Sequence, residues 1–496
     1  MDSGLILALD QGTTSSRALL FDHQARLVGS AQHSFEQIYP KPAWVEHDPQ
    51  EILSSQFKAV DDALAATAAK AQQIAAIGIS NQRETTLVWD KKTGKPIANA
   101  IVWQCRRTSE MLEQICKDPQ VEEGIIDRTG LVPDAYFSAT KIAWLLNEVP
   151  GARAAAKRGE LAFGTVDTWL VYQLTGGLVH ATDITNASRT MLFNIHTRKW
   201  DDSLLELFDI PQSLLPEVRP SASDYGMTNH EAVPKGIRIT GVAGDQQAAL
   251  FGQRCFEKGE AKNTLGTGAF MLMHTGNRAY RSKNRLITTM AAAFPNDEEQ
   301  SYALEGSIFV AGALIQWLRD ELGLISSAAE TEGLAESTPD NAGVYIVPAF
   351  TGLGAPWWDA DARGAILGLT RGAGREHIVR AALESIAYQT ADLVSAFEDD
   401  TELSLNSLKV DGGAAANGFL AQFMSDLLGI QISRPHSFEA SGLGAAFLAG
   451  LTVGFWRDKD ELLGLHLPSD EFVPREVDRD RLMTGWHQAL GRVRST

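Results

Sequence analysis

The chain of 496 residues has few cysteines, a deficit of basic charge and no long apolar run. Its three cysteines, Cys105, Cys116 and Cys255, form no C-x-x-C pair, which argues against a disulfide framework and favours the reducing cytoplasm. The longest small-apolar run, 442–455, is too short and too rich in Gly and Ala to insert in a membrane, and it predicts a buried, closely packed helix. No basic segment precedes the first apolar run, so we expect no signal peptide.

Charge narrows the class of protein further. The net charge is −18, whereas a nucleic-acid-binding protein needs a basic face, so we expect no nucleic-acid partner. The negative net charge does not exclude binding of ATP, because a local phosphate-binding loop functions even in a protein that is acidic overall. The length of 496 residues predicts two or more domains, and the hydrophobic content of 44% is ordinary for a globular chain.

The opening stretch, residues 5–22, is the first feature with chemical content. Two apolar runs flank a short polar loop, which predicts strand, tight turn and strand. Asp10 closes the first strand, Gly12 lets the backbone approach a ligand, and Arg17 supplies a cation. Three hydroxyl side chains add to the turned backbone N–H groups, a combination suited to phosphate. They are Thr13, Thr14 and Ser15. The alternative interpretation is an ordinary hairpin with a polar tip.

Three further apolar runs end in polar loops. The run 74–80 leads into Asn81-Gln82-Arg83-Glu84, and the run 237–242 leads through a glycine turn to Asp245 at a helix start. The run 408–410 leads into Asp411-Gly412-Gly413, where two glycines permit close approach to a flat ligand such as adenosine. Ligands of α/β proteins bind at the carboxyl ends of strands, so these loops are candidate sites. Each is also open to interpretation as a solvated loop.

A weak internal repeat divides the chain. Residues 263–273 form a second apolar hairpin with a Gly-Thr turn, an echo of the opening stretch that suggests two related halves. We expect a boundary within 252–259, giving domains 1–252 and 253–496. The two hairpin loops would then grip a nucleotide from both sides.

Periodicity and capping signals predict the helices. Helices are expected at 48–70, 136–146, 312–322, 375–399, 417–428 and 441–453. Two more are predicted only by their starts: one opens at 103–107, and one begins with Asp167 as its N-cap. Residues 183–188 are interpreted as a polar loop, and the tail from Ser469 is uninformative.

Together these motifs resemble the FGGY family of carbohydrate kinases, within the actin and heat-shock ATPase superfamily, over nearly the whole chain. The similarity is greatest to the members that phosphorylate glycerol. It rests on 10–17, 81–86, 244–247 and 354–359, and on two family-wide signatures at 136–144 and 364–384.

The resemblance implies an α/β protein of two actin-like (ribonuclease H-like) domains, each a mixed sheet flanked by helices, with a catalytic cleft between them. It implies ATP-dependent phosphorylation of glycerol to sn-glycerol 3-phosphate in glycerol uptake and catabolism, with Mg²⁺ accompanying ATP, and a homodimer or homotetramer. The first domain would hold the phosphate loop and the substrate. The substrate residues would be Arg83, Glu84, Tyr136, Asp245 and Gln246, with Trp103 and Phe270 as apolar walls. The second domain would hold adenosine. The nucleotide site as a whole would use residues of both domains: Thr13, Thr14, Ser15, Arg17, Thr267, Gly312, Gln316, Gly413 and Asn417.

By the same resemblance, Asp245 is the general base. Asp10 and Asp245 would together hold magnesium, through water molecules. Two alternatives stay open. One is another polyol or sugar kinase of the family, such as a xylulose or erythritol kinase, against which Arg83-Glu84 and Gln246-Gln247 argue. The other is an actin-like ATP-binding scaffold or chaperone, in which Trp103, Tyr136 and Phe270 are core aromatics.

Regulation is expected to differ from that of some relatives. In bacterial relatives inhibited by fructose 1,6-bisphosphate, a Gly-rich basic loop holds the sugar phosphates. The matching segment here, 225–238, has Glu231, which repels phosphate, and Pro234, which removes a backbone N–H. We therefore expect no inhibition by this sugar bisphosphate. His230 is interpreted as a solvated loop histidine rather than a phosphorylation site.

Overall fold

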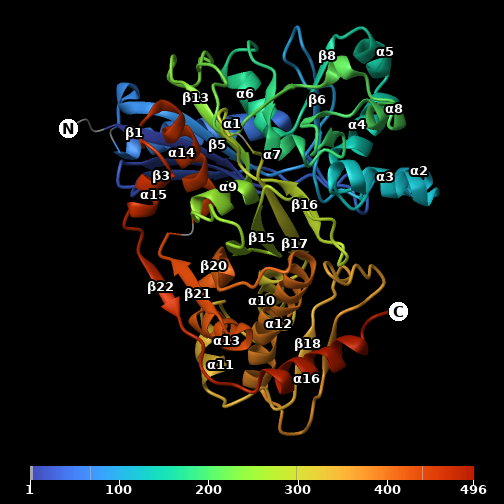
Figure 1. Ribbon diagram of the computed structural model, residues 1–496, viewed down its shortest axis with the longest axis vertical. Helices are drawn as coiled ribbons and strands as arrows, with labels where there is room; N and C mark the ends of the chain where they lie inside the picture. The colour runs from blue at the N-terminus through green and yellow to red at the C-terminus, as the bar shows by residue number, and fades with distance from the viewer. Residues whose placement is uncertain (1–3, 68, 298, 438, 496) are drawn as a thin grey trace.

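The computed structural model describes residues 4–67, 69–297, 299–437 and 439–495, arranged as two halves that each enclose a sheet (Figure 1). The first sheet has the strand order β13-β5-β1-β2-β3, with β2 antiparallel to β1 and β3, and β5 and β13 parallel to β1. Its strands are β1 (Leu5–Gln11), β2 (Ser15–Phe21), β3 (Leu27–Ser34), β5 (Ile74–Asn81) and β13 (Ile239–Gly244).

The second sheet repeats this topology. Its order is β16-β17-β15-β14-β20-β21-β22, with β14, β15 and β17 antiparallel in turn and β20 and β21 parallel to β14. The internal repeat and the mixed sheets predicted from the sequence are therefore confirmed. The strands are β14 (Ala261–Leu265), β15 (Ala269–Gly276), β16 (Ile287–Met290), β17 (Tyr302–Ile308), β20 (Ser407–Asp411), β21 (Gln431–Pro435) and β22 (Ser469–Phe472).

Alternate residues of the first sheet pack on opposite layers of helices, as period-two strands require. Leu7, Leu9 and Val242 belong to a core shared with α1 (Pro49–Thr67) and α6 (Val166–Leu174). Ile6 and Ala8 belong to another core, shared with α9 (Asp245–Gly252) and α14 (Ala440–Val453). In the second half, α12 (Arg375–Thr401), α13 (Gly418–Leu428) and α10 (Gly312–Asp320) share one large core with that half's sheet.

Helix α14 is the late segment of the chain that returns to the first sheet (Figure 1). Its small residues permit backbone contact, because a Cβ on Gly78 would lie 2.1 Å from the Ala445 carbonyl oxygen. The closely packed helix predicted at 441–453 is confirmed. By sequence, α14 belongs to the predicted second domain, 253–496. In space it packs on the sheet of the first half, so the division by sequence and the division in space differ for this helix. The domain boundary after Gly252 stays a prediction.

Three local predictions were wrong. No helix opens at 103–107; α2 begins at Ser109, and Trp103 lies in a turn. Thr165, not Asp167, is the N-cap of α6. The polar loop predicted at 183–188 is a buried turn of helix, α7 (Ile184–Ala187), capped by Asp183.

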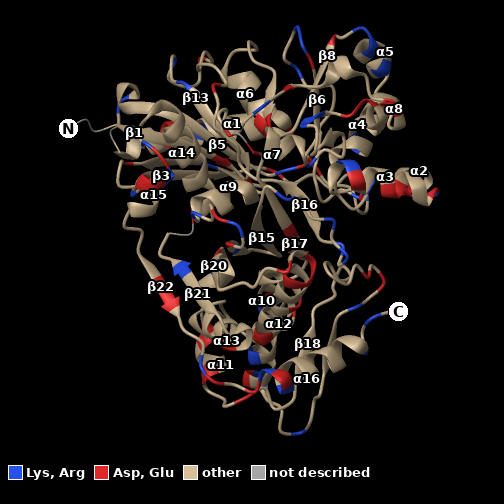
Figure 2. Cartoon of the chain, viewed as in Figure 1, with Lys and Arg blue, Asp and Glu red and all other residues tan. Residues whose placement is uncertain are grey.

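The tail is ordered rather than featureless. After β22 it forms α16 (Arg479–Gly491), whose Trp486 is buried and donates from Nε1 to Asp392 Oδ2 at 2.7 Å. Among the described residues, no helix has both the length and the apolar character needed to cross a membrane. Acidic and basic residues are interspersed over both halves in the view of Figure 2.

The remaining elements are peripheral to the sheets. The helices are α2 (Ser109–Ile115), α3 (Pro119–Thr129), α4 (Ser138–Glu148), α5 (Ala152–Lys157), α8 (Asp202–Leu207), α11 (Glu330–Glu336) and α15 (Lys459–Gly464). The short strands are β4 (Glu46–His47), β6 (Leu87–Asp90), β7 (Ala100–Ile101), β8 (Leu161–Gly164), β9 (Ala181–Asp183), β10 (Phe193–Asn194), β11 (Lys199–Trp200), β12 (Glu217–Arg219), β18 (Tyr345–Val347) and β19 (Ala365–Leu367).

Candidate active site

Three parallel strands of the first sheet end at one edge. In the register of β1 with β5, Asp10 lies opposite Ser80, and in that of β13 with β5, Gly244 lies opposite Asn81. The polar residues that follow each strand are therefore neighbours, as the sequence predicted. This edge gathers Asp10, Arg83 and Asp245 from segments far apart in the chain.

Arg83 is buried and bound on two sides. Its Nε lies 3.3 Å from Asp245 Oδ1, and its Nη1 and Nη2 bind the two oxygens of Glu305 at 2.6 and 3.1 Å. Gly244 makes room for this side chain, because a Cβ there would lie 2.7 Å from Arg83 Cγ. The guanidinium thus has a fixed position before any ligand arrives.

Glu84 sits on strained backbone, with φ of +60°. Its carbonyl oxygen accepts hydrogen bonds from Thr86 Oγ1, Ser138 Oγ and Lys141 Nζ at 3.0, 3.2 and 3.2 Å. Burial lowers the pKa of Lys141 to about 7. The family-wide signature at 136–144 therefore has a structural role, since Ser138 and Lys141 hold the backbone that presents the Glu84 carboxylate.

Aromatic rings cover the opposite side of the site. The Trp103 ring lies 5.5 Å from that of Tyr136 and 6.4 Å from that of Phe270, both edge-on. Trp103 Nε1 donates to Thr13 Oγ1 at 3.0 Å, so the aromatic wall adjoins the phosphate loop. The predicted substrate aromatics come together from both halves of the molecule.

Asp245 is the first residue of α9, where the helix N-terminus favours negative charge. Its Oδ1 accepts from the backbone N–H of Gln246 at 2.7 Å, and 30% of the side chain is exposed. Burial raises the pKa of Asp245, an effect opposed by the charges of Arg83 and Lys262. A carboxylate that is accessible and more basic than usual suits proton acceptance.

Gln246 is held from the second half by Lys262 on β14. Lys262 Nζ donates to Gln246 Oε1, to Thr264 Oγ1 at 2.8 Å and to the Phe270 carbonyl at 3.3 Å. Burial lowers the pKa of Lys262 to about 8, against the opposite effect of nearby carboxylates. Lys262 therefore contacts two predicted substrate residues, Gln246 and Phe270, and its charge acts to lower the pKa of Asp245.

The predicted nucleotide residues of the second half meet around the Gly266–Gly268 turn. Gly312 N donates to the Gly266 carbonyl at 2.9 Å, which places the start of α10 against this turn. Gly412 adopts φ of +88°, and Gly413 follows it. Asn417 caps α13 by accepting from Leu420 N at 2.9 Å. Thr267, Gln316 and Gly413 are exposed.

The phosphate loop of the first half is closed by a bond from Gly12 N to the Ser15 carbonyl at 2.9 Å. Thr14 is exposed at its tip, and Ser15 Oγ accepts from Gln32 at 2.7 Å. The hairpin and its polar turn are as predicted. Whether they hold phosphate stays a prediction.

Asp10 lies beside Arg17, with Asp10 Oδ2 at 3.9 Å from Arg17 Nη1, which in turn binds Glu439 Oε2 at 2.9 Å. Burial raises the pKa of Asp10 to about 6; Arg17 opposes the rise, while Glu439 and Asp245 add to it. Two carboxylates, those of Asp10 and Glu439, thus flank one arginine at this point. Within the described part of the chain no three His, Cys, Asp or Glu side chains gather closely enough to hold a metal ion, so an ion here would need water or phosphate oxygens as further ligands.

Four site residues were missed from the sequence: Lys262, Glu305, Arg189 and Glu439. Lys262 and Glu305 are each the single charged residue of a largely buried strand, a signal that marks a functional strand position. Arg189 follows the segment mistaken for a polar loop. Glu439 precedes α14, and nothing local indicates that this helix returns to the first half.

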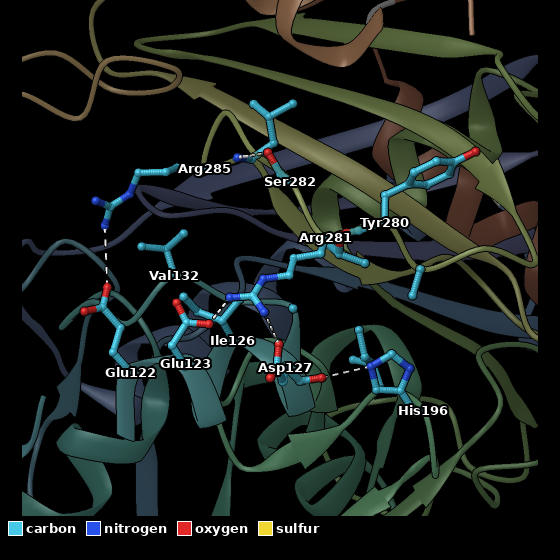
Figure 3. A pocket seen from close by; sticks show the side chains of 15 residues that line it. Glu122, Glu123, Ile126, Asp127, Val132, His196, Tyr280, Arg281, Ser282 and Arg285 are labelled. Carbon is cyan, nitrogen blue, oxygen red and sulfur yellow. Dashed lines mark hydrogen bonds and ion pairs between the residues drawn. The ribbon is translucent and has the colours of Figure 1, made fainter. Parts of the chain in front are cut away.

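A cavity of about 480 Å³ lies elsewhere, between α3 and residues 279–288 (Figure 3). Arg281 contacts Glu123 and Asp127 across it, and Arg285 lies 3.9 Å from Glu122. Its described lining residues include none of the predicted site residues. These charges are exposed and paired with each other, so the cavity contributes a contact between the halves rather than chemistry.

Comparison with known proteins places the whole chain in one family. Residues 5–252 match the N-terminal domain of the FGGY family of carbohydrate kinases, and residues 261–453 match its C-terminal domain. The glycerol kinases of Carboxydothermus hydrogenoformans and Shewanella baltica (strain OS223) are each 57% identical to this chain over 497 residues, which is 100% of this chain and 99% and 100% of theirs.

Solved structures agree with that assignment. The crystal structure of Plasmodium falciparum glycerol kinase with ADP superposes with a TM-score of 0.92 at 38% identity, covering 99% of this chain and 98% of that one. The xylulose kinase of Lactobacillus acidophilus, at 22% identity and a TM-score of 0.87 over 99% of this chain and 98% of its own, shares the fold.

Proposed function

Because the chain belongs to the FGGY family of carbohydrate kinases, we propose that it transfers the γ-phosphoryl group of ATP to glycerol, forming sn-glycerol 3-phosphate in glycerol uptake and catabolism. The observation that carries the proposal is the convergence of the substrate residues. Arg83, Glu84 and Asp245 lie at one sheet edge, and Trp103, Tyr136 and Phe270 form a wall of rings beside it.

These side chains suit a triol. Arg83 donates to hydroxyl oxygens, and Glu84 and Asp245 accept from hydroxyl protons, while the rings cover the C–H side of the molecule. Gln246, held by Lys262, supplies a further polar contact. Arg83-Glu84 and Gln246-Gln247 argue for glycerol over the substrate of another polyol or sugar kinase of the family.

Asp245 acts as the general base. It orients the terminal hydroxyl of glycerol, and its carboxylate accepts the proton as the oxygen bonds to the γ-phosphorus and ADP leaves. Phosphoryl transfer has a loose transition state, so positioning and charge neutralisation contribute more than the strength of the base. Lys262 and Arg83 stabilise the negative charge of Asp245 before transfer.

ATP is bound between the phosphate loop and the second half. Thr13, Thr14, Ser15 and Arg17 face its phosphates. The second half completes the nucleotide site through Thr267, Gly312, Gln316, Gly413 and Asn417. Asp10, with Asp245 through water, would hold Mg²⁺. The ion, when bound, neutralises charge on the phosphates. The reduced cysteines support a cytoplasmic location, and a homodimer or homotetramer is the proposed assembly.

The test is a substrate screen. Phosphate transfer from ATP is measured with glycerol and with a panel of pentuloses and tetritols at equal concentration. We expect turnover with glycerol well above that with any other polyol. ATP hydrolysis that is independent of every added polyol would instead support the scaffold alternative, and preference for a pentulose would support another kinase of the family.

A further inference from the structure

Two buried charged residues, Arg189 and Glu305, lie beneath the substrate side of the site, and the proposed mechanism assigns them no part. Both are fully buried. Arg189 follows α7 in the first half, and Glu305 is on β17 in the second. Arg189 Nη2 donates to Glu305 Oε1 at 3.0 Å, so this pair joins the two halves.

Each member of the pair also holds a substrate residue. Arg189 Nε donates to Glu84 Oε1 at 2.6 Å. The two oxygens of Glu305 accept from both terminal nitrogens of Arg83, as described above. The Arg189 guanidinium lies 5.7 Å from the centre of the Tyr136 ring, over its face. Three of the predicted substrate residues therefore contact one cross-half ion pair.

We propose that Arg189 and Glu305 are positioning residues for glycerol: they fix the Glu84 carboxylate and the Arg83 guanidinium, and they do so only when the two halves are together. This inference rests on the proposed function of the site. The pair itself touches neither ATP nor the reacting oxygen in the proposed mechanism, so it acts through Glu84 and Arg83.

The two members act differently on Glu84. Burial raises the pKa of Glu84, and the charges of Arg189 and Arg83 oppose that rise, whereas Glu305 adds to it. The other charged or titratable groups that face Glu84 are Lys141 and Tyr136. Loss of Arg189 therefore favours a protonated Glu84, which no longer accepts from glycerol in the same way, while loss of Glu305 leaves Glu84 ionised.

The experiment compares the full-length parent with Arg189→Met, Arg189→Lys and Glu305→Gln from pH 6 to pH 9. Glycerol-dependent turnover of the parent tests the proposed function by itself, and the ratio of each variant to the parent tests the pair. Glycerol-induced thermal stabilisation is measured beside the KM values, which gives a binding readout independent of turnover. The matched control is Arg107→Met. Arg107 also has a buried side chain, and its Nη2 lies 2.7 Å from Glu46 Oε1, but it is far in sequence from Arg189 and Glu305.

For Arg189→Met we expect the KM for glycerol to rise by roughly 30-fold at pH 6, the scale of one lost charge-assisted hydrogen bond, with the KM for ATP nearly unchanged. The rise should shrink several-fold toward pH 9, as Glu84 ionises again. Arg189→Lys should restore the pH profile and part of the affinity. Glu305→Gln should raise the KM for glycerol by about 10-fold at every pH, because Arg83 loses its charged partner.

The proposal is overturned if Arg189→Met and Glu305→Gln lower thermal stability as Arg107→Met does while leaving the KM for glycerol at the parent value. Equal increases in both KM values, or a rise for Arg189→Met that does not change with pH, would also overturn it. If Arg189→Met does not fold, Arg189→Lys and Glu305→Gln decide the matter. An unchanged glycerol KM in both of these variants then overturns it as well.

Discussion

The substrate side and the nucleotide side of the site are built in opposite ways. Arg83 and Glu84 are 3% and 1% exposed. The guanidinium of Arg83 is bound to Glu305, and the carboxylate of Glu84 is bound to Arg189. On the nucleotide side, Thr14, Thr267, Gln316 and Gly413 are exposed. Backbone hydrogen bonds hold the turns at Thr14 and Thr267, and one of them joins the second turn to α10, which carries Gln316. One side is organised by paired side chains, the other by the path of the main chain.

This difference fits the ligands proposed for each side. A small neutral triol offers few contacts, so its partners must be oriented and desolvated in advance, which paired buried charges achieve. Phosphates and a nucleotide offer charge and area of their own, and glycine turns present backbone N–H groups to them. Removing one member of the buried set leaves an uncompensated charge, whereas removing an exposed group costs a single contact.

The largest effect expected is that of Asp245→Asn. The amide keeps the size of the side chain but does not accept a proton, so kcat should fall by at least about 100-fold, the usual contribution of a general base. ATP binding, measured by nucleotide-induced thermal stabilisation, should persist. Turnover near the parent value in the purified variant would remove Asp245 from the mechanism.

Phe270→Ala should separate the two sides. The ring lies 6.4 Å from Trp103 and belongs to the substrate wall, so its loss should raise the KM for glycerol by roughly 10-fold, the equivalent of one exposed aromatic contact. The KM for ATP should change little. If the KM for ATP rose instead, the assignment of this wall to glycerol would be wrong.

Asn417→Ala probes the nucleotide side. Its side chain caps α13, and loss of a cap costs about 1 kcal/mol of stability. We expect a lower thermal midpoint and a KM for ATP raised about 3-fold, with the glycerol KM unchanged. Asp478→Ala, which removes the cap of α16, is the matched control: it should lower the midpoint without raising the KM for ATP. If both variants raised the KM for ATP equally, the increase would reflect lost stability and not a contact between Asn417 and the nucleotide.

The smallest effect is expected outside both sides. Millimolar fructose 1,6-bisphosphate should leave activity nearly unchanged at saturating glycerol and ATP. In the segment 225–238, Arg238 is paired with Asp224 at 3.1 Å, which leaves Lys235 as its exposed cation. His230 packs on Phe57, with ring centres 4.5 Å apart, rather than standing free in solvent. Strong inhibition with a shift to tetramer in light scattering would contradict this prediction.

Much of the fold was predictable because its signals are local. Pro49 at the start of α1, the apolar run of β5 and the two apolar runs of the opening hairpin each reflect the conformational preference of a few consecutive residues. The errors arose where tertiary contacts overrode those preferences. Asp167 looked like a cap, yet its carboxylate accepts from the hydroxyl of Thr182, which pairs it within the core.

The sequence by itself determined which chemical groups stand at the ends of which strands: Asp10, Arg83, Asp245 and the Gly412–Gly413 turn. Because β1, β5 and β13 are parallel strands of one sheet, Asp10, Arg83 and Asp245 come to one edge without further information, while the glycine turn follows β20 of the second sheet. Only the tertiary structure decided which groups hold them. Arg83 meets Glu305 across 222 residues of chain, and Arg189 meets Glu84 across 105. Such pairs depend on how two halves and a returning helix pack, and side-chain contacts of that range leave no periodic or local pattern in the sequence.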